Sequence, residues 1–248
     1  MQLYAIKEFT GKIILKSGLH IGSGDMEMKI GGTDNPVIKH PHTQEPYIPG
    51  SSLKGKVRAL LEMRSGLMGY TNGKPLDIAT YKDPDKKLND AEKKECKMIL
   101  KLFGAGASEK EAKEAEEIGP TRVAFADCPL DKDWKEKAET DFLPFIEVKS
   151  ENTINRIKGT ALNPRFTERV PAETEFSFSI TLKLTPDTKE NEVLENLLLE
   201  GLKLLQTDAL GGSGSRGYGR IRFDFDEQEN PGLNEKFDEI DPFARFHQ

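Results

Sequence analysis

The residues best suited to chemistry gather in a glycine-rich stretch from Leu210 to Arg220, which has five glycines among eleven residues. Glycine at this density indicates a backbone that adopts positive φ angles or that another group approaches closely. Backbone amides in a concave turn favour an anion, and an arginine beside an aromatic ring suits a phosphate that carries a base. We therefore predict a phosphate-bearing ligand here, bound by Gly212, Ser213, Gly214, Ser215, Arg216, Gly217 and Tyr218. The alternative is a long glycine turn with a solvated arginine.

The elements around this stretch exclude two common phosphate sites. Apolar residues at helical spacing predict a helix over 193–205 before it, and alternating residues predict a strand over 220–225 after it. Gly212, Gly214 and Gly217 match the dinucleotide-binding pattern, but that pattern must follow a strand and open a helix. The stretch also lacks the Gly-Lys-Ser/Thr ending of a Walker-type loop, so the sequence predicts neither of these sites.

A second group of polar residues opens a predicted helix near position 51. Ser51 and Ser52 are candidates for its N-cap. Lys54 and Arg58 share one face of this helix close to its N-terminus, and Lys56 lies on a neighbouring face. Cations beside the positive end of a helix repel one another unless an anion joins them, so a bound anion and a solvated basic flank are equally good interpretations.

Asp34 and His20 lie on turn-rich segments. Two glycines precede Asp34, and Asn35 and Pro36 follow it, which predicts a sharply shaped loop. A carboxylate there can bind a divalent cation or act as a base, but the spacing alone favours a carboxylate that caps a turn. His20 lies between two apolar residues, which favours a partly buried imidazole over a ligand-binding one.

Residues 145–169 lack a consistent hydrophobic face and alternate cations with β-forming residues. This pattern predicts a protruding hairpin that contacts a nucleic-acid strand, and the alternative is a mobile surface hairpin. Its cations are Arg156, Lys158, Arg165 and Arg169.

Composition limits the class of protein. The 248 residues carry a net charge of −6 and contain no apolar run of membrane-spanning length, so we expect no membrane partner. The N-terminus lacks the apolar region of a signal peptide, and the two distant cysteines fit a reducing cytoplasm. Residues 224–241 hold eight acids and one lysine, an acidic tail region that leaves the rest nearly neutral and able to carry basic sites.

The order of predicted elements indicates an α+β fold in one domain over residues 1–248. Strands are predicted at 9–16, 121–130 and 173–184 besides the last one at 220–225, with a helix after the first strand and another before the last. Charge-dense residues 65–119 predict a helical insertion. This order suits a ferredoxin-like (RRM-like) αβ sandwich with a helical insertion and a thumb hairpin at about 145–170.

Four motifs in the same order resemble those of one protein family. The motifs are the glycine-rich stretch at 211–220 and the segments 19–24, 30–38 and 49–58. The first resembles the glycine-rich loop of the RAMP superfamily of CRISPR proteins. All four together resemble the backbone subunit of the type III-A (Csm) interference complex.

The resemblance implies a set of partners and roles. Copies of the chain would stack along a CRISPR RNA together with other subunits of the complex. The glycine-rich loop and the Lys54 and Arg58 face would hold guide phosphates, and His20, Ser51, Ser52 and Lys56 belong to the same RNA-binding motifs. The hairpin would act as a thumb that wedges into the guide–target duplex and flips out nucleotides at regular spacing.

The resemblance also reverses the interpretation of Asp34, which would correspond to the family's essential aspartate for cutting complementary target RNA with a divalent ion, magnesium. The 2′-hydroxyl of RNA supplies the nucleophile, and Asp34 would accept its proton or hold the metal. Two alternatives stay open. One is a non-catalytic RNA-binding scaffold, and the other is a precursor CRISPR-RNA processing endoribonuclease that uses His20.

Overall fold

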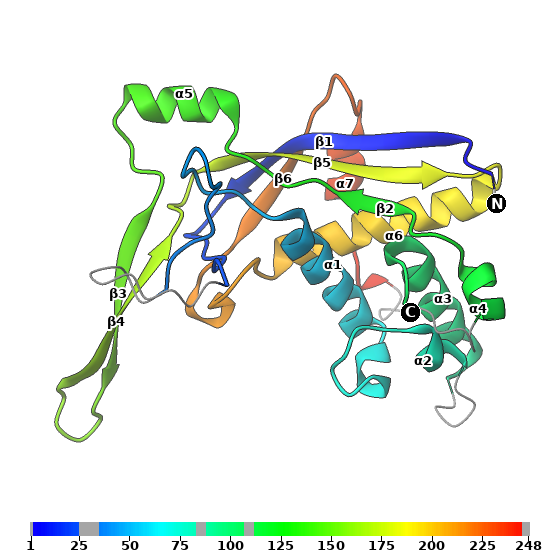
Figure 1. Ribbon diagram of the computed structural model, residues 1–248, viewed down its shortest axis with the longest axis horizontal. Coiled ribbons are helices and arrows are strands. Elements are labelled where there is room, and N and C mark those ends of the chain that lie inside the picture. The colour runs from blue at the N-terminus through cyan, green and yellow to red at the C-terminus, as the bar shows by residue number, and fades with distance from the viewer. Residues whose placement is uncertain (1, 25–34, 83–87, 107–111, 245–248) are drawn as a thin grey trace.

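The structure is a computed structural model that describes residues 2–24, 35–82, 88–106 and 112–244 (Figure 1). Its centre is a four-stranded antiparallel sheet in the order β2-β5-β1-β6. The strands are β1 (Ala5–Leu15), β2 (Val123–Phe125), β5 (Glu175–Leu184) and β6 (Ile221–Phe225). Helix α1 (Gly50–Arg64) joins β1 to β2, and α6 (Thr188–Thr207) joins β5 to β6. This is the order of a ferredoxin-like αβ sandwich, which confirms the predicted fold class.

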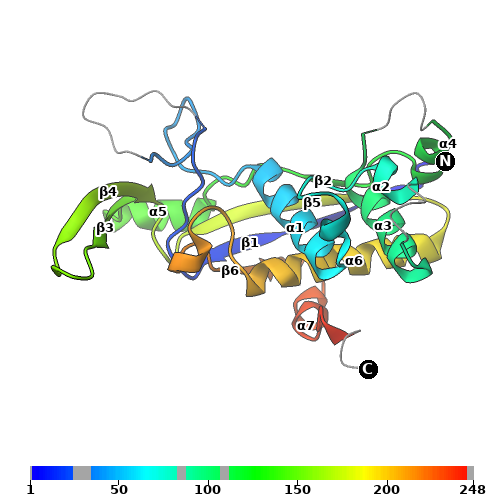
Figure 2. The ribbon, with the colours of Figure 1, turned by 90° about the horizontal axis from the view of Figure 1, so that it is seen from below.

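Alternation along the strands explains which face the helices cover. Phe176, Phe178, Ile180 and Leu182 are buried on one face of β5, while the residues between them are only half-buried. Figures 1 and 2 place α1 and α6 together on this apolar face. The two helices approach closely because Gly201 has no side chain: a Cβ there would lie 2.7 Å from Cγ1 of Val57.

The predicted helical insertion follows α1. It contains η1 (Leu67–Tyr70), α2 (Ile78–Lys82), α3 (Asp90–Phe103) and α4 (Ala112–Ile118). Asn89 and Glu92 form a capping box that starts α3, and the apolar face of α3 packs against α1 and α6. Cys96 of α3 is fully buried in this core.

Two helices lie where the sequence predicted none. Helix α5 (Lys132–Thr140) stands apart from the sheet and leads into the hairpin (Figure 1). Helix α7 (Leu233–Asp238) lies within the predicted acidic tail, but Leu233 and Phe237 are buried, and Phe237 packs edge-on against Phe223 and Phe225. The acidic region is therefore part of the fold, since Leu233 and Phe237 of α7 belong to the hydrophobic core.

The hairpin is a separate two-stranded sheet made of β3 (Glu147–Ile154) and β4 (Ala161–Arg169). Figure 1 shows that it projects well beyond the central sheet, as expected for a thumb. None of the helices in the described ranges is long and apolar enough to cross a membrane.

Candidate nucleic-acid interface

The far end of the thumb exposes both cations and apolar side chains. Arg156 and Lys158 lie in the turn and Arg165 on β4, all exposed and without a carboxylate partner in the part of the chain that the structure describes. The Asn155 side chain shapes the turn, since it accepts hydrogen bonds from the backbone amides of Ile157 and Lys158. Ile157 is 96% exposed at the tip. This combination suits a charged ligand with apolar faces, such as a nucleic-acid strand.

The glycine-rich loop is a compact turn that needs its glycines for two reasons. Ser213 and Gly217 have φ values of 62° and 84° on either side of a 3₁₀ turn, η4 (Gly214–Arg216). Other glycines allow close backbone approach: a Cβ at Gly219 would lie 1.9 Å from the carbonyl oxygen of Leu210, and one at Gly211 would lie 2.3 Å from that of His20. The loop surface from Ser215 to Gly217 remains exposed.

Segment 18–22 joins the glycine-rich loop to the base of the thumb. On one side, the amides of Gly212 and Gly219 donate to the carbonyls of His20 and Gly18, both at 2.9 Å. On the other side, Leu19 pairs with Val170 in a bridge directly after β4. The loop and the thumb are therefore anchored to the same short segment.

His20 lies at the centre of this junction. Its Nδ1–H donates to the carbonyl of Glu168 on β4 at 2.7 Å, which fixes the orientation of the ring. Asn35 forms a parallel bridge with Thr167, next to Glu168. Asp34 itself lies outside the described residues, but the chain directly after it is attached at this junction. The structure thus brings together the glycine-rich loop, His20 and the residues that follow Asp34.

Tyr218 lies differently from the prediction that it contacts a base. Its side chain is only 1% exposed, and its hydroxyl donates to Glu151 on β3 at 2.8 Å. Burial and this hydrogen bond raise the pKa of Tyr218. Lys149 and Arg169 lie over its ring, at 4.5 and 5.1 Å from the centroid. Tyr218 therefore packs the loop against the thumb, and its ring has no face free for a base in this arrangement.

Two predicted RNA-binding arginines of this region are paired within the chain. Arg216 remains 54% exposed, but its guanidinium donates to Glu151 at 2.6 Å and to Ser213 at 2.8 Å. Arg169 is half-buried and pairs with Glu147 at 2.6 Å. A phosphate that binds Arg216 would therefore compete with the carboxylate of Glu151 for the guanidinium.

The start of α1 also corrects the sequence prediction. The N-cap is Pro49 rather than Ser51 or Ser52, and the first helical amide, that of Gly50, donates to the carboxylate of Asp127 at 2.7 Å. The side chain of Asp127, from a distant segment, thus accepts the hydrogen bond that was predicted for a capping serine. The two serines remain exposed or half-buried at the first turn.

The cations of α1 separate into two groups. Arg58 pairs with Glu62 at 2.7 Å and donates to the carbonyls of Leu76 and Gly104, so it ties the insertion to α1 and is not available to a guide phosphate. Lys56 pairs with Asp208 at 2.6 Å. Lys54 has no carboxylate partner among the described residues, and burial, aided by Arg58, lowers its pKa. Of the three, Lys54 is the cation that an anion would stabilise most.

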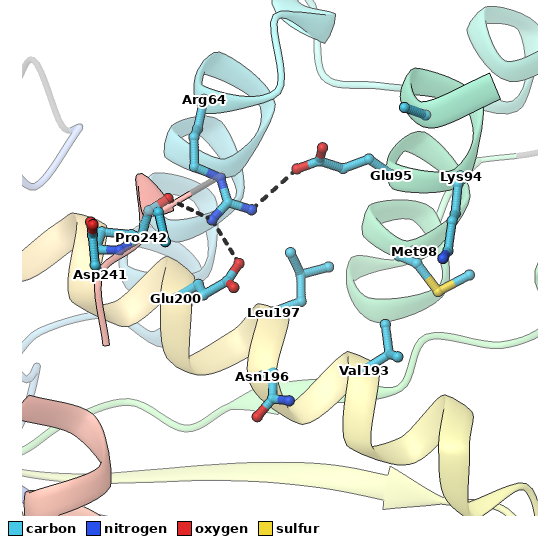
Figure 3. A pocket seen from close by; sticks show the side chains of 12 residues that line it. Arg64, Lys94, Glu95, Met98, Val193, Asn196, Leu197, Glu200, Asp241 and Pro242 are labelled. Atoms are coloured by element: carbon cyan, nitrogen blue, oxygen red, sulfur yellow. Dashed lines mark hydrogen bonds and ion pairs between the residues drawn. The ribbon is translucent and has the colours of Figure 1, made fainter. Parts of the chain in front are cut away.

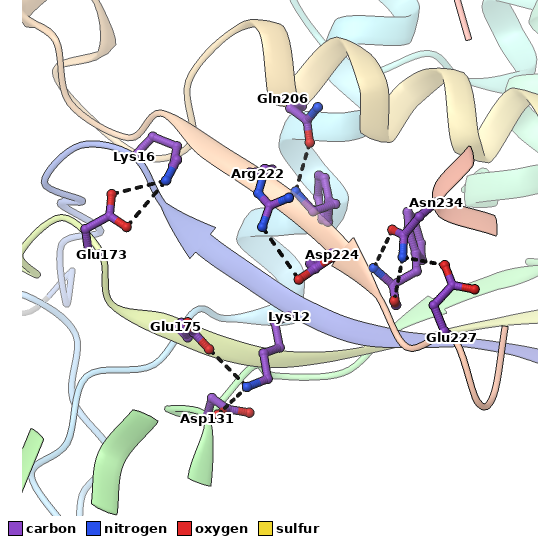
Figure 4. A network of polar contacts seen from close by, with 12 residues as sticks. Lys12, Lys16, Asp131, Glu173, Glu175, Gln206, Arg222, Asp224, Glu227 and Asn234 are labelled. Atoms are coloured by element: carbon purple, nitrogen blue, oxygen red, sulfur yellow. Dashed lines mark hydrogen bonds and ion pairs between the residues drawn. The ribbon is translucent and has the colours of Figure 1, made fainter. Parts of the chain in front are cut away.

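The uncovered face of the central sheet is not an RNA platform of the RRM type, which stacks bases on aromatic side chains. Its outward-facing residues on β1 and β5 include Thr10, Lys12, Ser177 and Ser179 and no aromatic residue. Lys12 is neutralised by Asp131 at 2.9 Å and Glu175 at 3.0 Å, and these bonds raise its pKa (Figure 4). The candidate interface is therefore the thumb and loop end of the molecule.

Comparison with known proteins gives the family. Residues 12–222 match the model of the RAMP superfamily. The chain belongs to the RAMP superfamily. Among its relatives are three proteins named CRISPR system Cms endoribonuclease Csm3, so this RAMP protein belongs to the Csm3 family. They come from Methanocaldococcus jannaschii (41% identical, 86% of this chain and 76% of that protein), Methanothermobacter thermautotrophicus (39%, 86% and 82%) and Streptococcus thermophilus (38%, 89% and 88%).

Solved RAMP structures share this fold. The chain is similar to a protein chain in the crystal structure of the Csm3–Csm4 subcomplex of the type III-A CRISPR-Cas interference complex. The TM-score is 0.52 and the sequence identity 26%, and the match covers 97% of this chain and 98% of the other chain. It is also similar to Methanopyrus kandleri Csm3, with a TM-score of 0.56, 25% identity and coverage of 90% and 76%. These likenesses confirm the family that the four motifs indicated.

This molecule also has a pocket far from the junction, among its helices. It has a volume of about 410 Å³ and lies between α3, α6 and the segment after α7 (Figure 3). Arg64, only 4% exposed, crosses it to Glu95, Glu200 and the carbonyl of Pro242. These contacts hold the C-terminal segment against the insertion.

A metal centre made by several side chains is not found among the described residues, which contain no group of three or more His, Cys, Asp and Glu placed to hold an ion. At the junction, the carboxylate of Glu168 accepts from the Val37 amide and is paired with Lys39 at 3.0 Å.

Proposed function

We propose that this chain binds a CRISPR RNA as a backbone subunit of a type III-A effector complex and cleaves complementary target RNA through Asp34. The observation that carries the proposal is the junction at segment 18–22. There the exposed glycine-rich loop, His20 and the chain that follows Asp34 meet at the base of a cationic thumb. The names of the relatives, which are endoribonucleases of the CRISPR system, support this activity.

Guide and target would contact different parts of this end of the molecule. The exposed surface of the glycine-rich loop from Ser215 to Gly217, with the guanidinium of Arg216, suits the guide backbone, and Lys54 is a second cation. The thumb, with Arg156, Lys158 and the apolar tip residue Ile157, suits insertion into a duplex. Copies of the chain stacked along one guide would then repeat this arrangement at regular spacing, next to other subunits of a cytoplasmic complex.

The chemistry needs a positioned carboxylate rather than a large catalytic apparatus. The 2′-hydroxyl of the target attacks the neighbouring phosphate, and splaying a nucleotide out of the stack aligns this attack with the leaving oxygen. The 2′-oxygen would bond to phosphorus as the bond from phosphorus to the 5′-oxygen breaks, and the 5′-oxygen would leave as a hydroxyl. Asp34 would accept the proton of the 2′-hydroxyl or would hold a magnesium ion near the phosphate. Such an ion supplies charge neutralisation at the phosphate when bound.

The test uses the complex assembled with a guide and a matching labelled target RNA in the presence of magnesium. We expect wild type to cut at regular intervals, and Asp34→Ala and Asp34→Asn to bind the target with unchanged affinity without cutting it. A chelator should abolish the cuts in wild type. Unchanged cutting by Asp34→Ala would show that the chemistry lies on another residue or subunit.

A further inference from the structure

Glu168 on the thumb strand β4 holds three parts of the junction at once. Its backbone amide donates to the carbonyl of Asn35 at 3.0 Å, and its backbone carbonyl accepts from His20 at 2.7 Å. Its carboxylate accepts from the amide of Val37 at 3.1 Å and pairs with Lys39 at 3.0 Å. One residue of the thumb therefore holds the residues one, three and five positions after Asp34.

The side chain of Glu168 is placed where these contacts are strong. It is 15% exposed and Lys39 is 29% exposed, so water screens the pair less than it screens the open ion pairs of the surface. The same oxygen, Oε2, takes both the amide and the lysine, so that segment 37–39 is held by a charge-assisted hydrogen bond as well as by an ion pair. Segment 37–39 is therefore attached to β4 through the side chain of Glu168.

We propose that Glu168 is a positioning residue for target-RNA cleavage, because its carboxylate fixes the chain after Asp34 to the strand that carries the thumb. This inference rests on the proposed function of Asp34. It adds that the position of the thumb determines the position of the carboxylate that cleaves the target. A thumb that is not seated on its RNA would leave Asp34 away from the scissile phosphate, and guide–target pairing would be coupled to cutting.

The main test is Glu168→Ala in the assembled complex, measured by target affinity and by the single-turnover cleavage rate at saturating complex. Misplacement of a reacting group by about 1 Å costs about 100-fold in rate, so we expect the rate to fall by about 10- to 100-fold. Target affinity should stay within about twofold, because Glu168 is an acid that a phosphate would not seek. Glu168→Gln keeps an acceptor for the Val37 amide but loses the charge. Its cleavage rate should therefore lie between the rates of wild type and Glu168→Ala.

Glu147→Gln is the matched control. It removes the same charge from the base of the same hairpin, where Glu147 pairs with Arg169, and among the described residues no hydrogen bond or ion pair joins its side chain to segment 35–39. It should cleave like wild type. Hydrogen exchange of RNA-free protein gives a second readout: the Val37 amide should exchange at least about 10-fold faster in Glu168→Ala than in Glu147→Gln.

The outcomes separate this proposal from the one on which it rests. If Asp34→Ala abolishes cutting while Glu168→Ala and Glu168→Gln cut at the wild-type rate, only the role of Glu168 is overturned. Equal losses of affinity and rate in Glu168→Ala, or equal losses in Glu147→Gln, would also overturn it, since they indicate general damage to the thumb. Normal cutting by Asp34→Ala would overturn both proposals.

Discussion

At the insertion end of the molecule, Arg58, Arg64 and Arg122 are at most 16% exposed, and each donates to carboxylates or carbonyls of the chain itself. At the thumb end, Arg156 and Arg165 are exposed and have no such acceptor among the described residues. The same side chain is thus a structural clamp at one end and a candidate ligand-binding group at the other. What decides its role is whether the fold supplies acceptors for its five N–H donors.

Removing a clamp should have the largest effect on stability. Arg122 is 2% exposed and donates to the carbonyl of Lys183, to Glu190 and to Asn191. Arg122→Met removes a buried guanidinium from these half-buried acceptors, so we expect a loss of about 3 kcal/mol in the free energy of unfolding, measured with urea. Arg156→Met should change it by less than about 0.5 kcal/mol. Similar losses for both variants would erase the distinction between the two ends.

Removing the exposed cations should act on RNA instead. For the triple variant Arg156→Ala, Lys158→Ala and Arg165→Ala, we expect weaker binding of single-stranded RNA. Because each phosphate contact contributes about 0.7 to the slope of log affinity against log salt, the slope should fall by about 2. Arg222→Ala is the control, since Arg222 is 51% exposed on the uncovered sheet face and pairs loosely with Asp224 at 3.6 Å. An equal effect of this control would indicate general electrostatics rather than a thumb contact.

The connection between α5 and the thumb contains a strained residue. Phe142 adopts a φ of 55° directly after the C-cap of α5, although its side chain is 93% exposed and gains little from packing. Glycine is the residue that suits this left-handed position, so Phe142→Gly should stabilise the isolated subunit by about 1 kcal/mol. Thermal unfolding would check this. A lower melting temperature would mean that the aromatic ring contributes to the fold.

The smallest expected effect is at Glu151, which shares the charge of Arg216. Glu151→Gln should free Arg216 and tighten RNA binding by about two- to threefold in low salt.

The hydrogen bond from Tyr218 and the charge of Arg216 lower the pKa of Glu151 below its ordinary 4.5. A carboxylate whose pKa is lowered by folding contributes stability that is fully present above its ordinary pKa and is lost as the pH falls through the lowered pKa. The melting temperatures of wild type and variant should therefore differ at pH 7 and converge when the pH falls below the lowered pKa of Glu151.

Regular elements with clear apolar patterns could be predicted from the sequence. The alternation of Phe176, Phe178 and Ile180 gave β5 its correct inward face, and the leucines of α6 marked the longest helix. Helix α5 was missed because Ala138 is its only buried residue, so it has no apolar stripe to recognise. Helix α7 was missed because it has only two buried apolar residues, Leu233 and Phe237, within an acidic segment.

The roles of polar side chains were harder to predict because their partners are distant in the sequence. Nothing near Tyr218 indicates that its hydroxyl bonds to Glu151, 67 positions earlier. Arg58 was predicted to bind phosphate because its true acceptors, the carbonyls of Leu76 and Gly104, lie far from it in the sequence, within the insertion. The position of Glu168 in the junction had no sequence signal at all, since it became visible only when β4 was paired with segment 35–39.

The two buried cysteines lie in different parts of the fold and can report when each part opens. Cys96 belongs to the insertion, and Cys128 pairs through its backbone with Ile48, just before α1. Burial raises the pKa of Cys128 to about 12, so at neutral pH its thiol is almost entirely in the unreactive protonated form. Both thiols should therefore resist alkylation in the closed protein, and their separate modification rates would time the opening of each region without any introduced label.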